Sequence, residues 1–130
     1  MKTNFTLLIA DRNPNVRKFL QREMTAAGYQ ILLAENAREV LELAFRDKPL
    51  DMIILDPDLP DADESDILQL LLDRVPVLPV VMHTYPAENG NRLKGMNGII
   101  FVEKSGNSVE RLKQVVYEAL VGSPFRLQKI

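Results

Sequence analysis

The chain has 130 residues, 46% of them apolar, which is enough for one compact domain that buries roughly two-thirds of its unfolded surface. It has no cysteine and one histidine, so disulfides, thiolate nucleophiles and metal sites rich in Cys or His are excluded, and chemistry must use carboxylates, hydroxyls, amines and backbone. Its 16 basic and 18 acidic residues are mixed along the chain and aromatic residues make up 6%, so we expect no direct nucleic-acid binding.

Neither a membrane span nor a targeting segment is expected. No run of eighteen apolar residues occurs, and the chain begins with the polar segment Met1-Lys2-Thr3-Asn4. We therefore predict a cytoplasmic protein with no membrane partner. No repeat or linker divides the sequence, so we predict a single domain over residues 1–130, with its core at about 5–121 and a short tail at 122–130.

Short apolar runs alternate with segments of helical period, the pattern of βα units in a parallel sheet. The first strand is predicted at residues 5–10, and the helix after it ends at Gly28, a C-cap. The second strand is predicted at 30–34. Its helix begins after the N-cap Asn36 and stops at Lys48-Pro49.

The second half of the chain continues the alternation. Residues 52–55 form a continuous apolar run, typical of a strand covered on both faces at the centre of a sheet, and Ser65 is predicted to cap the helix that follows. In the rest of the chain, strands are predicted at 80–82 and 99–102. Helices are predicted at 85–95 and from Asn107 or Ser108 onward. The helix at 85–95 should be short, because it contains Pro and Gly.

Polar side chains stand at the ends of four predicted strands: Asp11, Asp56, Thr84 and Lys104. Parallel strands end at one edge of a sheet, where ligands of open α/β sheets bind. A carboxylate there can attack phosphorus and form an aspartyl phosphate, and a hydroxyl, an ammonium and Mg²⁺ can stabilise the added charge. Each residue taken alone is better explained as a solvated helix cap, but all four on four separate strand ends favour a site.

These segments resemble the receiver domains of two-component response regulators, over about residues 5–121. The matching motifs, in order and with the spacing of the family, are Leu8-Ile9-Ala10-Asp11 followed by Pro14 and Arg17, Ile54-Leu55-Asp56-Pro57-Asp58-Leu59-Pro60, Val80-Val81-Met82-His83-Thr84, and Phe101-Val102-Glu103-Lys104. The resemblance implies a flavodoxin-like α/β fold, a (βα)5 three-layer sandwich whose five-stranded parallel sheet has the order 2-1-3-4-5.

The resemblance also implies roles for the residues at the strand ends. Asp56 corresponds to the phosphoacceptor, and Asp11, Asp56 and the backbone carbonyl of Asp58 correspond to ligands of Mg²⁺. Thr84 corresponds to the hydroxyl that contacts the phosphoryl group and rearranges on activation. Lys104 corresponds to the lysine that neutralises that group.

Two further positions could modulate the site. Arg12 stands where the family has a second metal-binding acid, and an inward guanidinium would weaken Mg²⁺ binding or bridge Asp56 in place of the cation. An outward guanidinium would leave the metal to Asp11, Asp56 and Asp58, and the sequence leaves both orientations open. Phe101 matches the aromatic switch position of the family, although core packing explains it equally well.

Other departures surround the switch hydroxyl. Tyr85 replaces a small residue and Ser105 replaces a proline, so we expect the neighbouring partner surface to be remodelled. We interpret His83 as a packed or hydrogen-bonded side chain and place it outside the site.

The leading hypothesis is a phosphoacceptor that takes a phosphoryl group from a sensor histidine kinase or a phosphotransfer protein and signals to a downstream protein partner. It is not expected to be an enzyme beyond its own phosphorylation and dephosphorylation. One alternative is an interaction-only pseudo-receiver in which Arg12 replaces the metal and phosphate chemistry. A remote alternative is a phosphatase of the haloacid-dehalogenase type, suggested by Asp56-Pro57-Asp58, although that pair follows the third strand and no acid pair follows Lys104.

Overall fold

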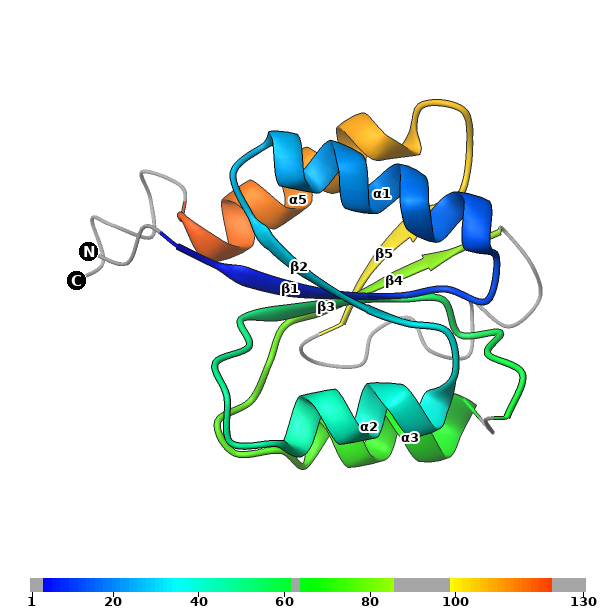
Figure 1. Cartoon of the computed structure of the whole chain (residues 1–130), viewed down its shortest axis with the longest axis vertical. Helices are drawn as coiled ribbons and strands as arrows, with labels where there is room; N and C mark the ends of the chain where they lie inside the picture. Colours follow the sequence, from blue (N-terminus) through cyan, green and yellow to red (C-terminus); the bar gives the residue numbers. More distant parts are fainter. Residues whose placement is uncertain (1–3, 62–63, 86–98, 123–130) are drawn as a thin grey trace.

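The computed structural model describes residues 4–61, 64–85 and 99–122. Five parallel strands form one sheet between two layers of helices, as Figure 1 shows, in the order β2-β1-β3-β4-β5. The strands are β1 (Thr6–Ala10), β2 (Gln30–Ala34), β3 (Met52–Leu55), β4 (Val80–Thr84) and β5 (Ile99–Glu103). The predicted flavodoxin-like α/β fold and its strand order are therefore confirmed.

Helices cover both faces of the sheet. The described helices are α1 (Pro14–Ala26), α2 (Ala37–Phe45), α3 (Glu64–Leu72) and α5 (Ser108–Leu120). Figure 1 shows α1 and α5 on one face and α2 and α3 on the other. The short helix predicted at 85–95 lies, apart from Tyr85, outside the described residues.

Several predicted boundaries are wrong by one to a few residues; strand β1 begins at Thr6 rather than at residue 5, and β5 ends at Glu103 rather than at residue 102. Helix α3 already includes Ser65 as its second residue, so Ser65 cannot be its N-cap. Helix α2 ends at Phe45, before Lys48-Pro49, because the backbone of Arg46 turns to an extended conformation with ψ 160°. Strand β4 extends two residues beyond Met82, because pairing with β5 continues to the end of both strands.

Asp61 ties the loop after β3 to the start of α2. Its carboxylate accepts hydrogen bonds from the backbone amides of Ala37 at 2.6 Å and Arg38 at 3.2 Å. The hydrogen bond from Ala37, followed by the one from Arg38, lowers the pKa of Asp61 against the opposing effect of burial.

The predicted N-cap Asn36 is confirmed, since its side chain accepts from the Glu39 amide.

The apolar core lies in two clusters, one on each face of the sheet. Alternate residues of a strand point to opposite faces, so Ile53 packs in the cluster beneath α2 and α3, and Ile54 in the cluster beneath α1 and α5. All four residues of β3 are buried, as the apolar run at 52–55 predicted. This packing fixes the carboxyl ends of the central strands, where the polar residues stand.

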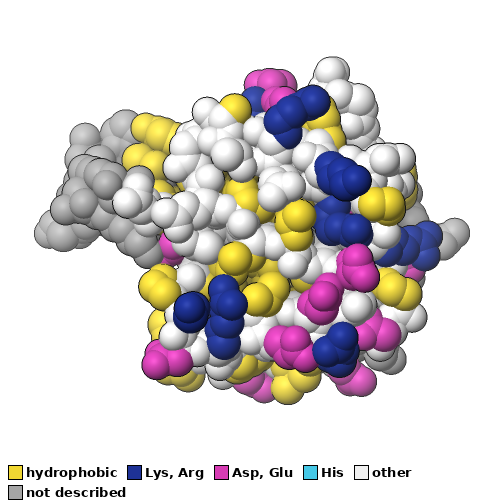
Figure 2. Space-filling model, in the orientation of Figure 1, with side chains coloured by type: hydrophobic (Ala, Val, Ile, Leu, Met, Phe, Trp, Pro, Cys, Tyr) yellow, Lys and Arg dark blue, Asp and Glu magenta, His cyan; other side chains and the backbone are white. Residues whose placement is uncertain are grey.

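The face of the molecule drawn in Figure 2 has mixed charge. On this face, acidic and basic side chains are interspersed rather than separated into fields of one sign. None of the helices in the described parts of the chain is long and apolar enough to cross a membrane.

Candidate functional site

Three of the predicted site residues meet at the carboxyl edge of the sheet. The ammonium Nζ of Lys104 lies 2.9 Å from Asp11 Oδ2 and 3.5 Å from Asp56 Oδ2. Asp11 is 1% exposed and Asp56 4% exposed. This arrangement follows from the strand register: Ala10 pairs with Leu55, so the two aspartates that follow them are neighbours, and the Asp56 amide donates to the Ala10 carbonyl at 2.8 Å.

The second oxygen of each carboxylate is held by the backbone. The Asn13 amide donates to Asp11 Oδ1 at 2.9 Å, and the Asp58 amide donates to Asp56 Oδ1 at 3.0 Å. Arg17 adds a hydrogen bond to the Asp11 carbonyl at 2.6 Å. Two fixed carboxylates against one ammonium leave one net negative charge, which favours an additional cation at this edge.

The donor atoms at this edge fit Mg²⁺, which prefers oxygen ligands and is commonly held by one or two carboxylates with water. Asp11 and Asp56 supply the two buried carboxylates, and the Asp58 carbonyl is the third predicted ligand. Within the parts of the chain that the structure describes, no group of three His, Cys, Asp or Glu side chains is placed to hold a metal. Any Mg²⁺ site would therefore depend on the carbonyl and on water as well as on the two carboxylates.

Arg12 points outward. Its guanidinium NH2 lies 3.2 Å from Asp58 Oδ2, and the two side chains are 58% and 73% exposed. Arg12 therefore pairs with Asp58 and does not form the bridge to Asp56 that an inward orientation would give. The pair also offsets the charge of the Asp58 carboxylate beside the predicted metal ligands.

Thr84 and Phe101 make contacts of other kinds in this structure. The Thr84 hydroxyl donates to the Tyr85 carbonyl at 3.3 Å, whereas the Thr84 carbonyl accepts from the Lys104 amide at 2.7 Å. The Lys104 ammonium lies 5.3 Å from the centre of the Tyr85 ring, within the range of a cation–π interaction. Phe101 is half-buried against the cluster beneath α2 and α3, which agrees with a packing role, and its role as a switch remains a prediction.

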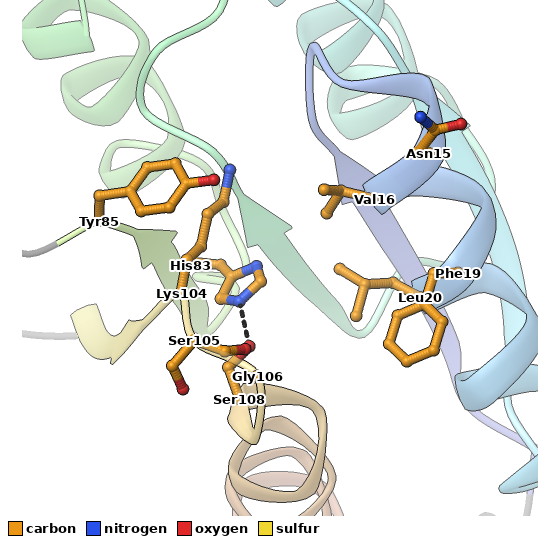
Figure 3. A pocket seen from close by; sticks show the side chains of 10 residues that line it. All are labelled: Asn15, Val16, Phe19, Leu20, His83, Tyr85, Lys104, Ser105, Gly106 and Ser108. Atoms are coloured by element: carbon orange, nitrogen blue, oxygen red, sulfur yellow. Dashed lines mark hydrogen bonds between the residues drawn. The ribbon is translucent and has the colours of Figure 1, made fainter.

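His83 lies beside this site, which the sequence interpretation did not anticipate. It is 4% exposed, and its Nε2 lies 3.0 Å from Ser108 Oγ (Figure 3). The pKa of His83 is lowered to about 4, chiefly by burial and then by the positive charge of Lys104, whereas the negative charge of Asp56 acts in the opposite direction. Its interpretation as a hydrogen-bonded, buried side chain is confirmed, although a partner 25 residues away could not be read from the chain.

The lowered pKa of His83 predicts a loss of stability in acid. In the unfolded chain His83 binds a proton below about pH 6.5, the ordinary histidine pKa, whereas in the folded chain it binds a proton only near pH 4. The contribution of neutral His83 to the free energy of unfolding should therefore be complete above pH 6.5, and the free energy of unfolding should fall by about 3 kcal/mol towards pH 4. Urea unfolding of the wild type and His83→Phe across this range measures the effect; equal pH dependence in both would contradict it.

Known proteins share this architecture. TrrA from Thermotoga maritima, whose structure is a complex with Mg²⁺-BeF, superimposes with a TM-score of 0.80 at 27% identity, over 89% of this chain and 99% of that one. CheY4 of Vibrio cholerae gives a TM-score of 0.78 at 20% identity, over 91% and 100% of the two chains, which shows the shared fold.

Known protein sequences are similar to this chain as well. Response regulator MprA of Mycolicibacterium vanbaalenii is 30% identical over 91 residues, which are 70% of this chain and 39% of that protein. The alkaline phosphatase synthesis transcriptional regulatory protein PhoP of Bacillus subtilis is 28% identical over 93 residues, 72% of this chain and 38% of that protein. The chain thus spans about two-fifths of the length of these relatives. The family model described as response regulator receiver domain matches residues 7–116, and the chain belongs to that family.

Proposed function

We propose that the chain is a phosphoacceptor in two-component signalling and that Asp56 is the residue phosphorylated. The observation that supports this most directly is the position of the Asp56 carboxylate. The Asp58 amide holds one oxygen, and the other oxygen faces the Lys104 ammonium at 3.5 Å, at the ligand-binding edge of the sheet. This carboxylate is the proposed acceptor of the phosphoryl group. It is fixed in place and lies next to a positive charge that can stabilise that group.

In the proposed step, an Asp56 oxygen attacks the phosphorus of a phosphohistidine on a sensor histidine kinase or phosphotransfer protein. The new O–P bond forms as the P–N bond breaks, and the departing imidazole takes up a proton. Lys104 stabilises the transferred charge, because its ammonium is already within reach of Asp56.

Mg²⁺ is the proposed cofactor, held by the Asp11 and Asp56 side chains and the Asp58 carbonyl. When bound, it would neutralise negative charge on the transferring phosphoryl group. The residues of the chain itself orient the reaction: backbone amides fix both carboxylates, and Lys104 occupies the space between them.

The proposed output is a changed protein-binding surface that a downstream partner recognises, in the cytoplasm. Thr84 and Phe101 are the residues proposed to change conformation on phosphorylation. The pseudo-receiver alternative is not favoured, because Arg12 pairs with Asp58 and leaves Asp56 to Lys104. The match to the receiver family likewise gives the phosphatase alternative no support.

Incubation with acetyl phosphate and Mg²⁺, followed by intact mass measurement, tests the proposal. The wild type should gain the mass of one phosphoryl group, and Asp56→Asn should gain none, because the amide is not a nucleophile. Asp73→Asn, an exposed aspartate paired with Gln69 away from the site, is the matched control and should be phosphorylated as the wild type is. Phosphorylation of Asp56→Asn, or none of the wild type, would contradict the assignment.

A further inference from the structure

A cleft of about 480 Å³ opens beside Lys104, between α1 and the loop that joins β5 to α5. Its volume lies in the range of small-molecule sites. On the α1 side it is lined by Val16, Phe19 and Leu20, and on the sheet side by His83, Lys104 and Tyr85. Figure 3 shows the His83 ring directed from β4 towards Val16 and Leu20. The cleft therefore combines an apolar wall with a single deep imidazole.

The hydrogen bonds of Ser108 fix the tautomer of His83. The Ser108 hydroxyl donates to the Ser105 carbonyl oxygen at 3.0 Å. Since a hydroxyl has one proton, Ser108 can only accept from His83 Nε2 at 3.0 Å. From these two hydrogen bonds we assign the imidazole proton to Nε2, which leaves the lone pair of Nδ1 free.

His83 Nδ1 is a buried acceptor without a hydrogen-bond partner in the described part of the chain. Such groups are rare in folded proteins, because burial removes water that would otherwise donate to them. The lowered pKa of His83 agrees with this assignment, since it keeps the ring neutral at physiological pH. Because Nδ1 is buried, a molecule in the cleft can reach it only if the side chains of the cleft wall move slightly aside, and it must then bring a donor.

We propose that this cleft binds a small, neutral aromatic molecule with one N–H or O–H group, of the indole or phenol class, which donates to His83 Nδ1. The apolar side chains of α1 and the Tyr85 ring suit a flat aromatic body. The neighbouring carboxylates outnumber Lys104, which disfavours an anion. The proposal does not depend on phosphorylation of Asp56.

The test compares indole with indene, which has the same shape but no N–H donor. Because His83 is the one histidine of the chain, the ring nitrogens of the ¹⁵N-labelled protein give a single set of NMR signals. In the free protein we expect a protonated Nε2 and an unprotonated Nδ1. Indole should shift the Nδ1 signal and bind about tenfold more tightly than indene.

Variants distinguish the contribution of the apolar side chains of α1 to binding from that of His83 Nδ1. Phe19→Ala should weaken the binding of both compounds, whereas Phe45→Ala, a similarly exposed phenylalanine on α2, should change neither. His83→Phe should remove the preference for indole over indene. Ser108→Ala is a second variant for the case that His83→Phe does not fold. It should reduce the preference for indole, because Ser108 no longer holds the imidazole proton on Nε2. A protonated Nδ1 in the free protein, equal binding of indole and indene, or no binding of indole would overturn the proposal.

Discussion

Lys104→Met is expected to lower the free energy of unfolding by about 3–5 kcal/mol at neutral pH. The ammonium lies within 3.5 Å of both Asp11 and Asp56, and these side chains are almost fully buried. Methionine keeps much of the apolar stem but removes the charge, so two like charges remain buried without compensation. Urea unfolding followed by circular dichroism measures the loss.

Two controls test the cause. Lys113→Met removes an ammonium whose partner, Glu23, is 26% exposed, so solvent already screens that pair and the loss should be far smaller. Asp56→Asn, which relieves repulsion between the two aspartates, should recover much of the stability of Lys104→Met when the two are combined. If Lys104→Met cost no more than Lys113→Met, Lys104 would not be the group that stabilises the buried carboxylates.

The sequence predicted the sheet well because its strands differ physically from the segments around them. The continuous apolar run at 52–55 requires cover on both faces, and β3 is buried throughout. Parallel pairing then places Asp11 and Asp56 side by side, because each directly follows a paired strand end. Helix starts were less predictable: Ser65 and Asn36 are both plausible caps, but α3 begins at Glu64, two residues before the start that a Ser65 cap implies.

The parts of the site that depend on loops and on distant residues could not be read from the chain. Arg12 could turn inward or outward, and its outward position depends on where the loop after β3 places Asp58. The hydroxyl of Ser108 meets His83 only because α5 starts beneath the end of β4. Local sequence specifies strands and turns, whereas these contacts require the assembled tertiary structure.

Arg12→Asp is expected to bind Mg²⁺ about tenfold more tightly than the wild type. The substitution replaces a cation by an anion next to Asp58, whose carbonyl is a proposed ligand. Two unit charges 4 Å apart interact by about 4 kcal/mol at an effective dielectric constant of 20, and solvent screening of the exposed guanidinium reduces this strongly. Arg12→Gln, which removes the charge without adding an acid, should give an intermediate gain.

Titration of Mg²⁺ by calorimetry, repeated at higher salt, measures this effect. The gain should shrink as salt rises, because exposed charges are screened over about 10 Å at 0.1 M ionic strength. Arg38→Asp is the matched control: it makes the same change in charge on α2, at an arginine that is 68% exposed and also paired with a carboxylate. Equal affinity in Arg12→Asp and Arg38→Asp would mean that the metal site senses only the total charge of the protein. A gain confined to position 12 would identify the Arg12–Asp58 pair as the feature that weakens Mg²⁺ binding in this chain.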